Sequence, residues 1–215
     1  PGVDGVGRRR RDRGGRGECG GRRTRLAMAK EVLKKFIEKR PGDRIGLVVF
    51  ATQASIAAPP TLDHDSLLRT VARLELGTIQ NTQTAIGSGL STAINRLREL
   101  KSKSKIVILM TDGQNNAGKI QPLTAAEAAK ALEVKVYTIG VGMRGEAPVP
   151  VRDLFGGKRY QMVPVDIDED TLQKIADVTG GKYYRADNAS RFEAIYEEID
   201  KLEKTEAEVR KYTQF

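Results

Sequence analysis

Residues 105–118, KIVILMTDGQNNAG, decide the fold of this chain. The continuous apolar run from Ile106 to Met110 is typical of a strand that is covered on both faces, as in a parallel sheet. The run ends in Thr111-Asp112-Gly113, so polar side chains follow at the carboxyl end of the strand. A second apolar run, IGLVVF (45–50), has the same character. Both runs predict central strands of a parallel sheet.

Helical segments alternate with strands along the rest of the chain. Apolar residues from Leu26 to Ile37 recur at helical spacing, and Pro41-Gly42 ends that helix. The other expected helices are 64–75 (capped by Asp63), 84–100, 122–133, 168–178 and 189–204. The other expected strands are a short edge strand at 55–58, stopped by Pro59-Pro60, then 135–141 and 182–185, with a long loop and room for a hairpin at 143–164. This order predicts an α/β fold with a doubly wound, mostly parallel Rossmann-like sheet.

Length and composition fit one α/β domain with a sizeable core. The chain has 215 residues, of which 39% are hydrophobic. Its apolar runs are far shorter than the ~20 residues that a membrane-spanning helix needs. The single cysteine, Cys19, excludes an internal disulfide and a zinc site built from several cysteines.

The positive charge is concentrated at the amino terminus. Residues 1–25 contain nine arginines and three acidic residues, so they carry +6 of the net charge of +9. Residues 1–23 are rich in glycine and arginine, and Val3 and Val6 are their only aliphatic residues. Such a segment buries almost nothing, so we expect it to be disordered. Weak, salt-sensitive binding of polyanions through residues 8–25 is one candidate function, but specific recognition of nucleic acid is not indicated.

Two residues suggest a cation site at the carboxyl ends of the strands, where open α/β sheets bind ligands. Asp112 follows the strand at 105–110, and Thr84 begins a helix that has Gly87 and Gly89 in its first turns. A carboxylate and a hydroxyl are hard oxygen ligands that suit Mg²⁺ or Mn²⁺. The simpler interpretation of the same residues is that Thr84 caps a helix and Asp112 lies in a turn.

Two other patterns compete for a function. Residues 113–119, GQNNAGK, match a phosphate-binding loop, but Ile120 stands where that motif needs a serine or threonine for Mg²⁺. A nucleotide-binding protein using residues 113–119 is therefore the main alternative function. The acidic cluster at Asp166, Asp168, Glu169 and Asp170 lacks calcium-loop spacing, and acids favour a helix amino terminus, so we interpret it as structural.

Most of the chain resembles a von Willebrand factor type A (VWA) domain of the bacterial aerotolerance BatA kind. The resemblance covers about residues 24–206 and is specific through the order of its motifs. The matching stretches are AKEVLKKFIEKRPGDRIGLVVFA (29–51), TLDHDSLL (61–68), TAIGSGLSTAINRLR (84–98), KIVILMTDGQNNAG (105–118), LTAAEAAKALEVKVYTIGVG (123–142) and VPVDIDEDTLQKIADVTGGKYYRADNASRFEAIYEEIDKLEKTE (163–206).

The resemblance implies a metal-ion-dependent adhesion site (MIDAS), built in the family from an Asp-x-Ser-x-Ser after the first strand, a threonine and a later aspartate. By that resemblance Thr84 is the threonine and Asp112 the later aspartate, and a partner's carboxylate would complete the coordination. The Asp-x-Ser-x-Ser should precede the helix that begins near Leu26, yet no serine occurs before Ser55. We therefore expect a sheet that lacks its first central strand and a metal site that is incomplete.

The resemblance also implies domain boundaries. We expect a VWA-like domain at 24–206 that is incomplete at its amino terminus, and a tail at 207–215 leading toward a membrane segment outside this sequence. Our hypothesis for residues 1–23 is a shifted reading frame in GC-rich DNA, which makes the chain a fragment.

The function implied by the resemblance is a non-enzymatic protein-interaction module of a BatA-like envelope protein, without catalytic or cofactor-binding residues. Its expected partners are other envelope proteins of the same operon type. The resemblance places the domain on the periplasmic side of the bacterial inner membrane, anchored only through segments absent here, so the fragment alone is expected to be soluble. Mg²⁺ or Mn²⁺ is the cofactor of the intact family, and we expect this chain not to bind it.

Overall fold

The computed structural model of the protein describes residues 25–74, 83–102, 104–141, 145–152, 158–165 and 167–212. The expectations of disorder and of a shifted reading frame concern residues 1–23, which lie outside the described residues. Within the described part, strands and helices alternate as the sequence predicts, and the α/β fold class is confirmed.

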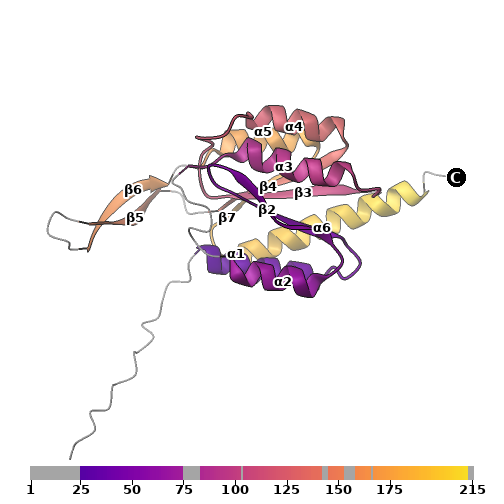
Figure 1. The fold of residues 1–215 in the computed structure, drawn as a ribbon, viewed down its shortest axis with the longest axis horizontal. Coiled ribbons are helices and arrows are strands. Elements are labelled where there is room, and N and C mark those ends of the chain that lie inside the picture. Colours follow the sequence, from indigo (N-terminus) through magenta and orange to yellow (C-terminus); the bar gives the residue numbers. More distant parts are fainter. Residues whose placement is uncertain are drawn as a thin grey trace, which may run out of the picture.

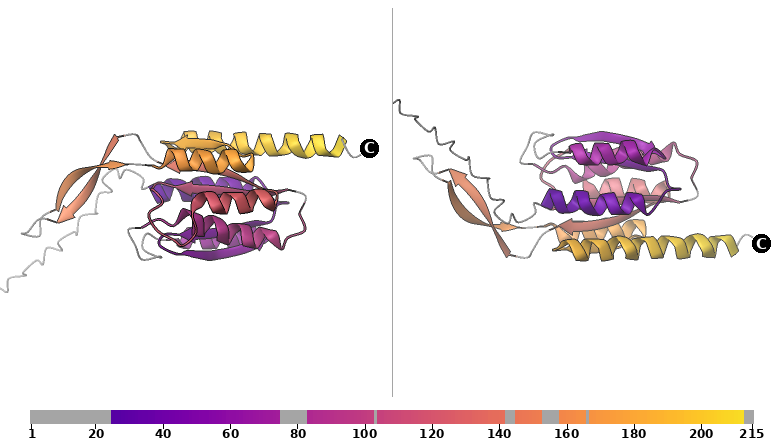
Figure 2. Two further views of the ribbon diagram at one scale, coloured as in Figure 1. Left: turned by 90° about the horizontal axis from the view of Figure 1, so that it is seen from above. Right: turned by 90° about the horizontal axis from the view of Figure 1, so that it is seen from below.

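The strands fall into three groups. Strands β3 (Lys105–Thr111), β4 (Val134–Val141) and β7 (Tyr183–Ala186) form a parallel sheet in the order β3-β4-β7. Strands β1 (Ile45–Phe50) and β2 (Ala54–Thr61) form an antiparallel pair. Strands β5 (Gly145–Arg152) and β6 (Lys158–Val165) form an antiparallel hairpin that extends away from the body (Figures 1 and 2). The segment 143–164, which was predicted to be a long loop that could contain a hairpin, thus contains one.

Helices cover both faces of the strands, so the body has three layers (Figure 1). On one face lie α3 (Ile86–Arg98), α4 (Pro122–Ala131) and α5 (Glu169–Thr179). On the other lie α1 (Arg25–Glu38), α2 (His64–Arg73) and α6 (Ala189–Tyr212). Figure 2 shows the same two layers from above and below.

Local sequence signals explain where several helices begin and end. The side chains of Asp63 and Asp168 accept hydrogen bonds from the backbone N–H groups of Ser66 and Thr171, so both aspartates cap helices, and only the cap at Asp63 was predicted. Within the acidic cluster, Asp168 therefore has a structural role, as the cap of α5. Helix α5 ends at Gly180, whose φ of 75° is left-handed and favours glycine.

Strand β4 is the best-covered strand of the sheet. Its residues Val136 and Ile139 are both 0% exposed, and they belong to the clusters on opposite faces. Leu90 and Ile175 cover one face, and Phe192 and Ile199 cover the other. The continuous apolar sequence of β4 therefore corresponds to burial on both sides, as expected for a strand inside a parallel sheet.

A gap separates β1 from β3. Within the described residues, β1 pairs only with β2 and β3 pairs only with β4, so each has one open edge. The two edges face a cavity of about 1620 Å³ that is lined by residues of both strands, from Ile45 to Phe50 and from Lys105 to Thr111. Among the described residues no strand lies between β1 and β3. The expectation that the sheet lacks its first central strand concerns residues ahead of α1, which lie outside the described part, and it stays a prediction.

Two boundaries differ from the sequence prediction. Strand β2 runs through Pro59 and Pro60, which were expected to stop it; proline is tolerated here because β2 pairs on one side only, as an edge strand. Pro60 packs within 3.0 Å of the position that a side chain at Gly46 would occupy. Helix α6 extends to Tyr212 rather than ending at 204.

Among the described residues, no helix is both long and apolar enough to cross a bilayer.

Candidate functional site at the carboxyl edge of the sheet

The carboxyl ends of β1 and β3 meet at the segment that precedes α3. The carbonyl of Ala51, directly after β1, accepts a hydrogen bond of 2.7 Å from the N–H of Ala85. The carbonyl of Thr84 accepts hydrogen bonds from the N–H groups of Asn116 (3.0 Å) and Ala117 (3.2 Å), which follow β3. Because both strands end at the same segment, they run in the same direction, and the cation site predicted from sequence lies at this edge.

Thr84 does not cap α3. The N-cap residue is Ala85, and no side chain of the cap residue bonds to the helix. The N–H of Ile86 is instead satisfied by Asn115, whose Oδ1 accepts it at 2.8 Å. The simpler interpretation of Thr84 as a capping residue is therefore wrong, because an asparagine from another loop supplies the acceptor that the helix end needs.

The loop after β3 fixes the backbone of Thr84. Asn116 Oδ1 accepts a hydrogen bond of 2.7 Å from the N–H of Thr84, while its own N–H donates to the carbonyl of Thr84. Gly118 adopts a φ of 95°, and a Cβ there would lie 2.9 Å from Ala85 Cβ. Side-chain and backbone contacts together therefore hold the segment 84–86 against the loop 113–118.

Asp112 lies beside this segment. Both Thr84 and Asp112 line the cavity between β1 and β3, at its carboxyl end. A Cβ added to Gly113 would lie 3.0 Å from Thr84 Oγ1, so the hydroxyl points at the residue next to Asp112. Asp112 is exposed and Thr84 is half-buried, so both residues reach the surface. The structure thus brings the two predicted site residues to one place.

Thr111 shapes the turn that carries Asp112. Its hydroxyl accepts a hydrogen bond of 3.2 Å from the N–H of Gly113, and the side chain is 7% exposed. This contact between a hydroxyl and the N–H two residues later is a common turn device. Sequence reasoning named Asp112 but missed this role of Thr111, although the Thr-Asp-Gly order carries the signal.

Thr52 is a further polar residue that sequence reasoning missed. Its hydroxyl is buried and has no hydrogen-bond partner in the part of the chain that the structure describes. It directly follows Ala51, whose carbonyl binds the segment before α3. A buried hydroxyl without a partner is unusual and indicates that another group completes this region.

The oxygens at this edge supply only part of a metal coordination shell. Among the described residues, no group of three or more His, Cys, Asp or Glu side chains is placed to hold a metal ion. Thr84 and Asp112 offer one hydroxyl and one carboxylate, whereas Mg²⁺ demands about six ligands and keeps waters where protein ligands are few. Within the part of the chain that the structure describes, Thr84 and Asp112 therefore do not amount to a complete site for a resident ion.

The loop 113–118 is poorly suited to bind phosphate. A phosphate-binding loop needs its backbone N–H groups free to face the ligand and a helix that begins directly after it. Here the N–H groups of Asn116 and Ala117 donate to Thr84, and α4 begins only at Pro122. The geometry therefore does not favour the nucleotide-binding alternative.

Comparison with known proteins identifies the family of this chain. A model of the von Willebrand factor type A domain matches residues 22–198 of the chain. The chain belongs to this family. The aspartate and the threonine described above stand at the edge of the VWA sheet where the MIDAS was expected from the sequence.

Curated relatives of this VWA chain are bacterial proteins. A protein of Borreliella burgdorferi is 31% identical over 189 residues, which is 87% of this chain and 55% of the relative. A UPF0353 protein of Mycolicibacterium paratuberculosis is 31% identical over 193 residues, which is 83% of this chain and 54% of the relative. The chain therefore spans about half the length of these relatives.

Two similar solved structures support the resemblance to aerotolerance proteins. The protein BatB from Bacteroides thetaiotaomicron is 30% identical, with a TM-score of 0.70 over 84% of this chain and 89% of that one. An aerotolerance-related membrane protein from Bacteroides fragilis is 28% identical, with a TM-score of 0.68 over 84% and 90%. Proximal thread matrix protein 1 from the mussel byssus has been solved with zinc in its MIDAS motif, but at 21% identity it shows the fold alone.

Proposed function

We propose that this VWA domain is a protein-interaction module, not an enzyme, and that it binds its partner at the carboxyl edge of the sheet around Thr84 and Asp112. One observation carries the proposal. The loop 113–118 and the segment before α3 hold each other so that an exposed carboxylate and a half-buried hydroxyl face the same cavity end. Backbone segments that are held in place before binding lower the ordering cost of meeting a partner.

The partners that we propose are envelope proteins of the same operon type. The parent protein would be anchored in the bacterial inner membrane, with this domain on the periplasmic side. The similarity to BatB and to an aerotolerance-related membrane protein supports this placement. The described residues contain no membrane-spanning helix, so the proposed anchor is a segment other than these.

In this proposal a cation is bound only when a partner supplies a further ligand. In an intact MIDAS, the ion bridges the domain and a carboxylate of the partner, and Thr84 and Asp112 would be two of the protein ligands. Because the described residues do not complete a site, we expect this chain to bind Mg²⁺ or Mn²⁺ no more tightly than about 1 mM. Calorimetric titration with either chloride salt measures this directly. Micromolar affinity that disappears in Asp112→Ala contradicts the expectation.

Isosteric variants test the docking surface. Asp112→Asn removes the charge, and Thr84→Val removes the hydroxyl, while each keeps the volume of the side chain. The matched controls are Asp65→Asn in α2 and Thr124→Val in α4, which are exposed residues that do not line the cavity between β1 and β3. The immobilised full chain and each variant are tested by interferometry against the soluble domains of the envelope proteins encoded beside it. Circular dichroism melts show whether each variant folds as the parent chain does.

We expect each site variant to weaken partner binding at least about tenfold, which corresponds to 1.4 kcal/mol, and each control to leave it unchanged. Site variants that fold and bind as the parent chain does would place the docking surface elsewhere. Absence of binding to every envelope protein of the operon contradicts the assignment of the partner.

A further inference from the structure

We propose that the outer edge of β6, from Lys158 to Met162, binds an extended acidic segment of the protein partner, which adds a third strand to the hairpin of β5 and β6. This edge is called the β6 edge below. The inference deepens the proposed function and rests on it for the source of the segment, because it adds a second contact to the docking surface around Thr84 and Asp112. The β6 edge itself consists of backbone groups that the structure describes.

The hairpin leaves the body at the edge of the sheet that carries the proposed docking surface. Strand β4 ends at Val141, and its residue Gly140 pairs with Thr111, directly before Asp112. Strand β5 begins at Gly145, and the hairpin extends outward from there (Figures 1 and 2). A partner bound at the docking surface therefore lies on the side of the body from which the hairpin extends.

The three prolines of β5 and β6 all fall in one class of register positions. The pairs that contain them are Glu146↔Pro164, Pro148↔Met162 and Pro150↔Tyr160. In an antiparallel pair, opposite residues alternate between pairs that exchange hydrogen bonds and pairs whose N–H and C=O groups point outward. Because proline lacks the N–H, it fits positions whose backbone faces outward. The prolines therefore mark the residues of both strands whose backbone groups face away from the hairpin.

The two outer edges of the hairpin differ in their backbone donors. On β5 the successive outward positions Pro148 and Pro150 both lack an N–H. On β6 the outward positions are Lys158, Tyr160 and Met162, and each has an N–H. Within the described residues β6 pairs with β5 alone. Since proline on an edge strand prevents further pairing, the β5 edge is closed to another strand and the β6 edge is open to one.

A third strand would turn the hairpin into a sheet of stable size. A two-stranded hairpin alone is marginally stable in water, whereas three strands with an apolar face are stable independently. Opposite residues share a face of the hairpin, so Tyr160 and Met162 lie on the same face as the two prolines of β5. Addition of a strand is a known mode of peptide recognition, in which main-chain hydrogen bonds give the affinity.

The charge of the β6 edge favours an acidic occupant. The cationic residues of the two strands, Arg152, Lys158 and Arg159, all lie at the end next to the turn. The acidic residue Glu146 lies at the other end, next to the body. Opposite charges on neighbouring strands stabilise a sheet. Because β6 begins at Lys158, an occupant that runs antiparallel to β6 should carry its acidic residues at its carboxyl end.

Two occupants from copies of this chain fit the β6 edge poorly. A second copy offers a β5 edge closed by prolines and a β6 strand, KRYQMVPV, without an acidic residue. Residues 1–25 contain nine arginines and three acidic residues, so their charge has the same sign as that of the β6 edge. The favoured occupant is therefore a segment of the separate protein partner.

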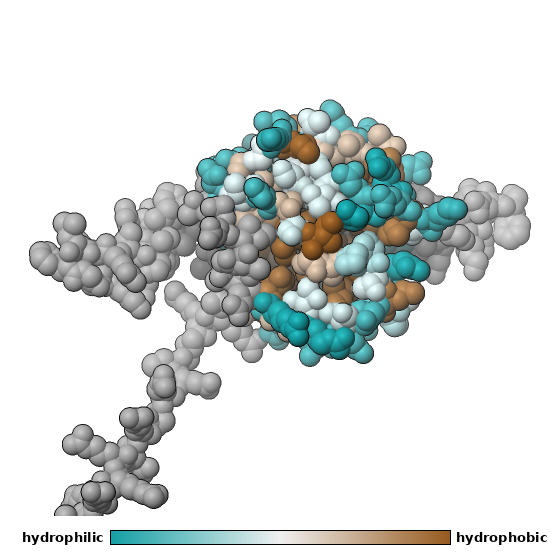
Figure 3. Space-filling view, viewed as in Figure 1, coloured by the Kyte–Doolittle hydropathy of each residue, from teal (hydrophilic) through white to brown (hydrophobic). Residues whose placement is uncertain are grey.

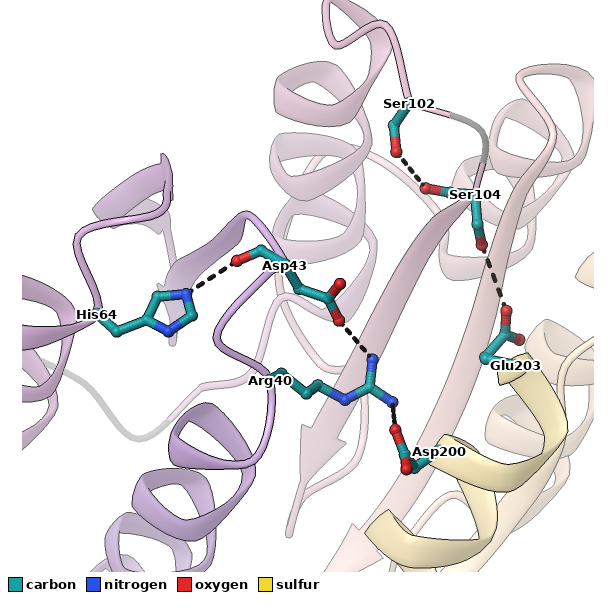
Figure 4. A network of polar contacts seen from close by, with 7 residues as sticks. All are labelled: Arg40, Asp43, His64, Ser102, Ser104, Asp200 and Glu203. Carbon is teal, nitrogen blue, oxygen red and sulfur yellow. Dashed lines mark hydrogen bonds and ion pairs between the residues drawn. The ribbon is translucent and has the colours of Figure 1, made fainter. Parts of the chain in front are cut away.

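Two other surface features of the body have internal explanations. Figure 3 shows hydrophobic side chains in the middle band of the molecule, at the level of the sheet where we expect the family's first central strand. Figure 4 shows a polar network at the amino edge of the sheet. In this network Arg40 donates to Asp43 (2.9 Å) and to Asp200 (2.6 Å). Because these groups bind one another, the network needs no partner.

A pair of synthetic peptides tests the proposal with the full chain. The acidic probe is Thr-Val-Thr-Val-Glu-Glu with fluorescein at its amino end, and the basic probe carries Lys-Lys in place of Glu-Glu. We expect saturable binding of the acidic probe by fluorescence anisotropy, and at least about tenfold weaker binding of the basic probe. Added salt should weaken the acidic probe, because exposed charges are screened.

A pair of variants at one position isolates the backbone donor. Tyr160→Pro removes an outward N–H of β6, and Tyr160→Ala keeps it, while both remove the phenol ring. Proline is compatible with this register position, since Pro150 already lies opposite. We expect Tyr160→Pro to bind the acidic probe at least about tenfold more weakly than Tyr160→Ala does. Circular dichroism melts show whether both variants fold as the parent chain does.

A charge reversal isolates the electrostatic contribution. Lys158→Glu should weaken the acidic probe and strengthen the basic probe, each at least about threefold, because the cross-strand charge pair is reversed. The matched control is Lys130→Glu on the exposed face of α4, which should change neither probe. Equal effects of the two reversals would mean that the probe responds to net charge and not to the β6 edge.

The envelope proteins used to test the docking surface also test the source of the strand. We expect the envelope protein that binds the parent chain to bind Tyr160→Pro at least about tenfold more weakly than Tyr160→Ala. Asp112→Asn should bind the acidic probe as the parent chain does. Normal probe binding together with undiminished binding of the envelope protein by Asp112→Asn would contradict the proposed docking surface alone. Equal binding of the envelope protein by the two variants at 160 would overturn the assignment of the strand to the partner.

Amide hydrogen exchange decides where the acidic probe lies. We expect it to slow exchange at Lys158, Tyr160 and Met162 and to leave β1 and β3 unchanged. Equal binding of the two probes, equal probe binding by the two variants at 160, or protection outside the hairpin would overturn the proposal. So would a free chain that is dimeric and becomes monomeric in Tyr160→Pro, because a second copy would then occupy the β6 edge.

Discussion

Strands β1 and β4 have similar sequences and very different surroundings. Both are nearly continuous apolar runs, IGLVVF and VKVYTIGV. In β4 every residue except Lys135 is buried, because β3 and β7 pair with it and helices cover both faces. In β1 no residue is buried, because β2 alone pairs with it among the described residues. An apolar run therefore predicts a strand, but its burial depends on a neighbour elsewhere in the sequence.

Strand β3 is intermediate in burial between β1 and β4. It pairs with β4 over its whole length, from Lys105↔Val134 to Thr111↔Gly140, and faces the cavity between β1 and β3 with its other edge. Only Leu109 and Thr111 of its seven residues are buried. Burial is thus lower in β1 and β3, which border the gap, than in β4, which has a neighbour on each side.

The largest expected effect comes from closing the gap covalently. Replacement of residues 1–23 by an apolar strand ending in Asp-x-Ser-x-Ser should make β1 resemble β4. Burial of several aliphatic side chains at ~1.5–3 kcal/mol each gives roughly 5 kcal/mol of added stability. For a domain of this size that is about 10–20 °C in Tm, and the Tm should become dependent on Mg²⁺.

Thermal melts with and without Mg²⁺ measure this effect. The control carries serine and glycine at the apolar positions of the inserted strand and should melt as the parent chain does. If the parent chain already melts cooperatively at high temperature and the insertion adds nothing, the gap does not limit stability.

A matched pair of substitutions compares the two strands directly. Val136 in β4 is 0% exposed, whereas Val48 in β1 is only partly buried. Val136→Ala should cost about 2 kcal/mol, from the lost burial and the cavity left behind. Val48→Ala should cost less than about 1 kcal/mol, since its surroundings already contain open space. Urea denaturation gives both values, and equal losses would mean that β1 is as well packed as β4 in solution.

Most of the fold followed from local signals in the sequence. The alternation of apolar runs and helical periodicity predicted the elements, and Asp63 was recognised as a cap. Two errors arose where tertiary context decides. Pro59 and Pro60 do not stop β2, because an edge strand tolerates residues without a donor. Thr84 is not a cap, because Asn115 arrives from a loop about thirty residues away, a contact that no local rule contains.

The third effect concerns the hydrogen bond between Asn115 and the N–H of Ile86 at the start of α3. Asn115→Ala removes the acceptor for the N–H of Ile86, and loss of a helix cap typically costs about 1 kcal/mol. Asn95→Ala, on the exposed face of the same helix, is the matched control and should cost only a few tenths of that. Chemical denaturation measures both values. A loss no greater than that of the control would show that the loop 113–118 does not hold the start of α3.

The smallest expected effect concerns the contact between α1 and α6, two helices that line the cavity between β1 and β3. A hydrogen bond from Lys35 lowers the pKa of the Glu193 carboxyl below its ordinary value, and the charges of Lys35 and Lys39 lower it further. A lowered pKa stabilises the fold above the pKa of the unfolded state, and this contribution is lost as the pH falls through the folded-state pKa. Both side chains are exposed, so the effect on stability is small.

Carboxyl NMR titration of Glu193 tests whether α1 is seated on α6 in the free chain. Lys35→Met should raise the pKa of Glu193 toward its ordinary value. The control Lys34→Met removes a neighbouring cation that pairs with Glu38 and should leave Glu193 unchanged. An unshifted pKa for Glu193 in the parent chain would show that the two helices are not held together by this pair.

Residue-resolved amide hydrogen exchange on the free chain measures the gap itself. If β1 and the near edge of β3 lack a neighbour, their open-edge amides should exchange at least about a hundredfold faster than those of Val136 and Ile139 in β4. Exchange that is as slow across β1 and β3 as it is across β4 would contradict the account, because it would mean that another strand already occupies the gap.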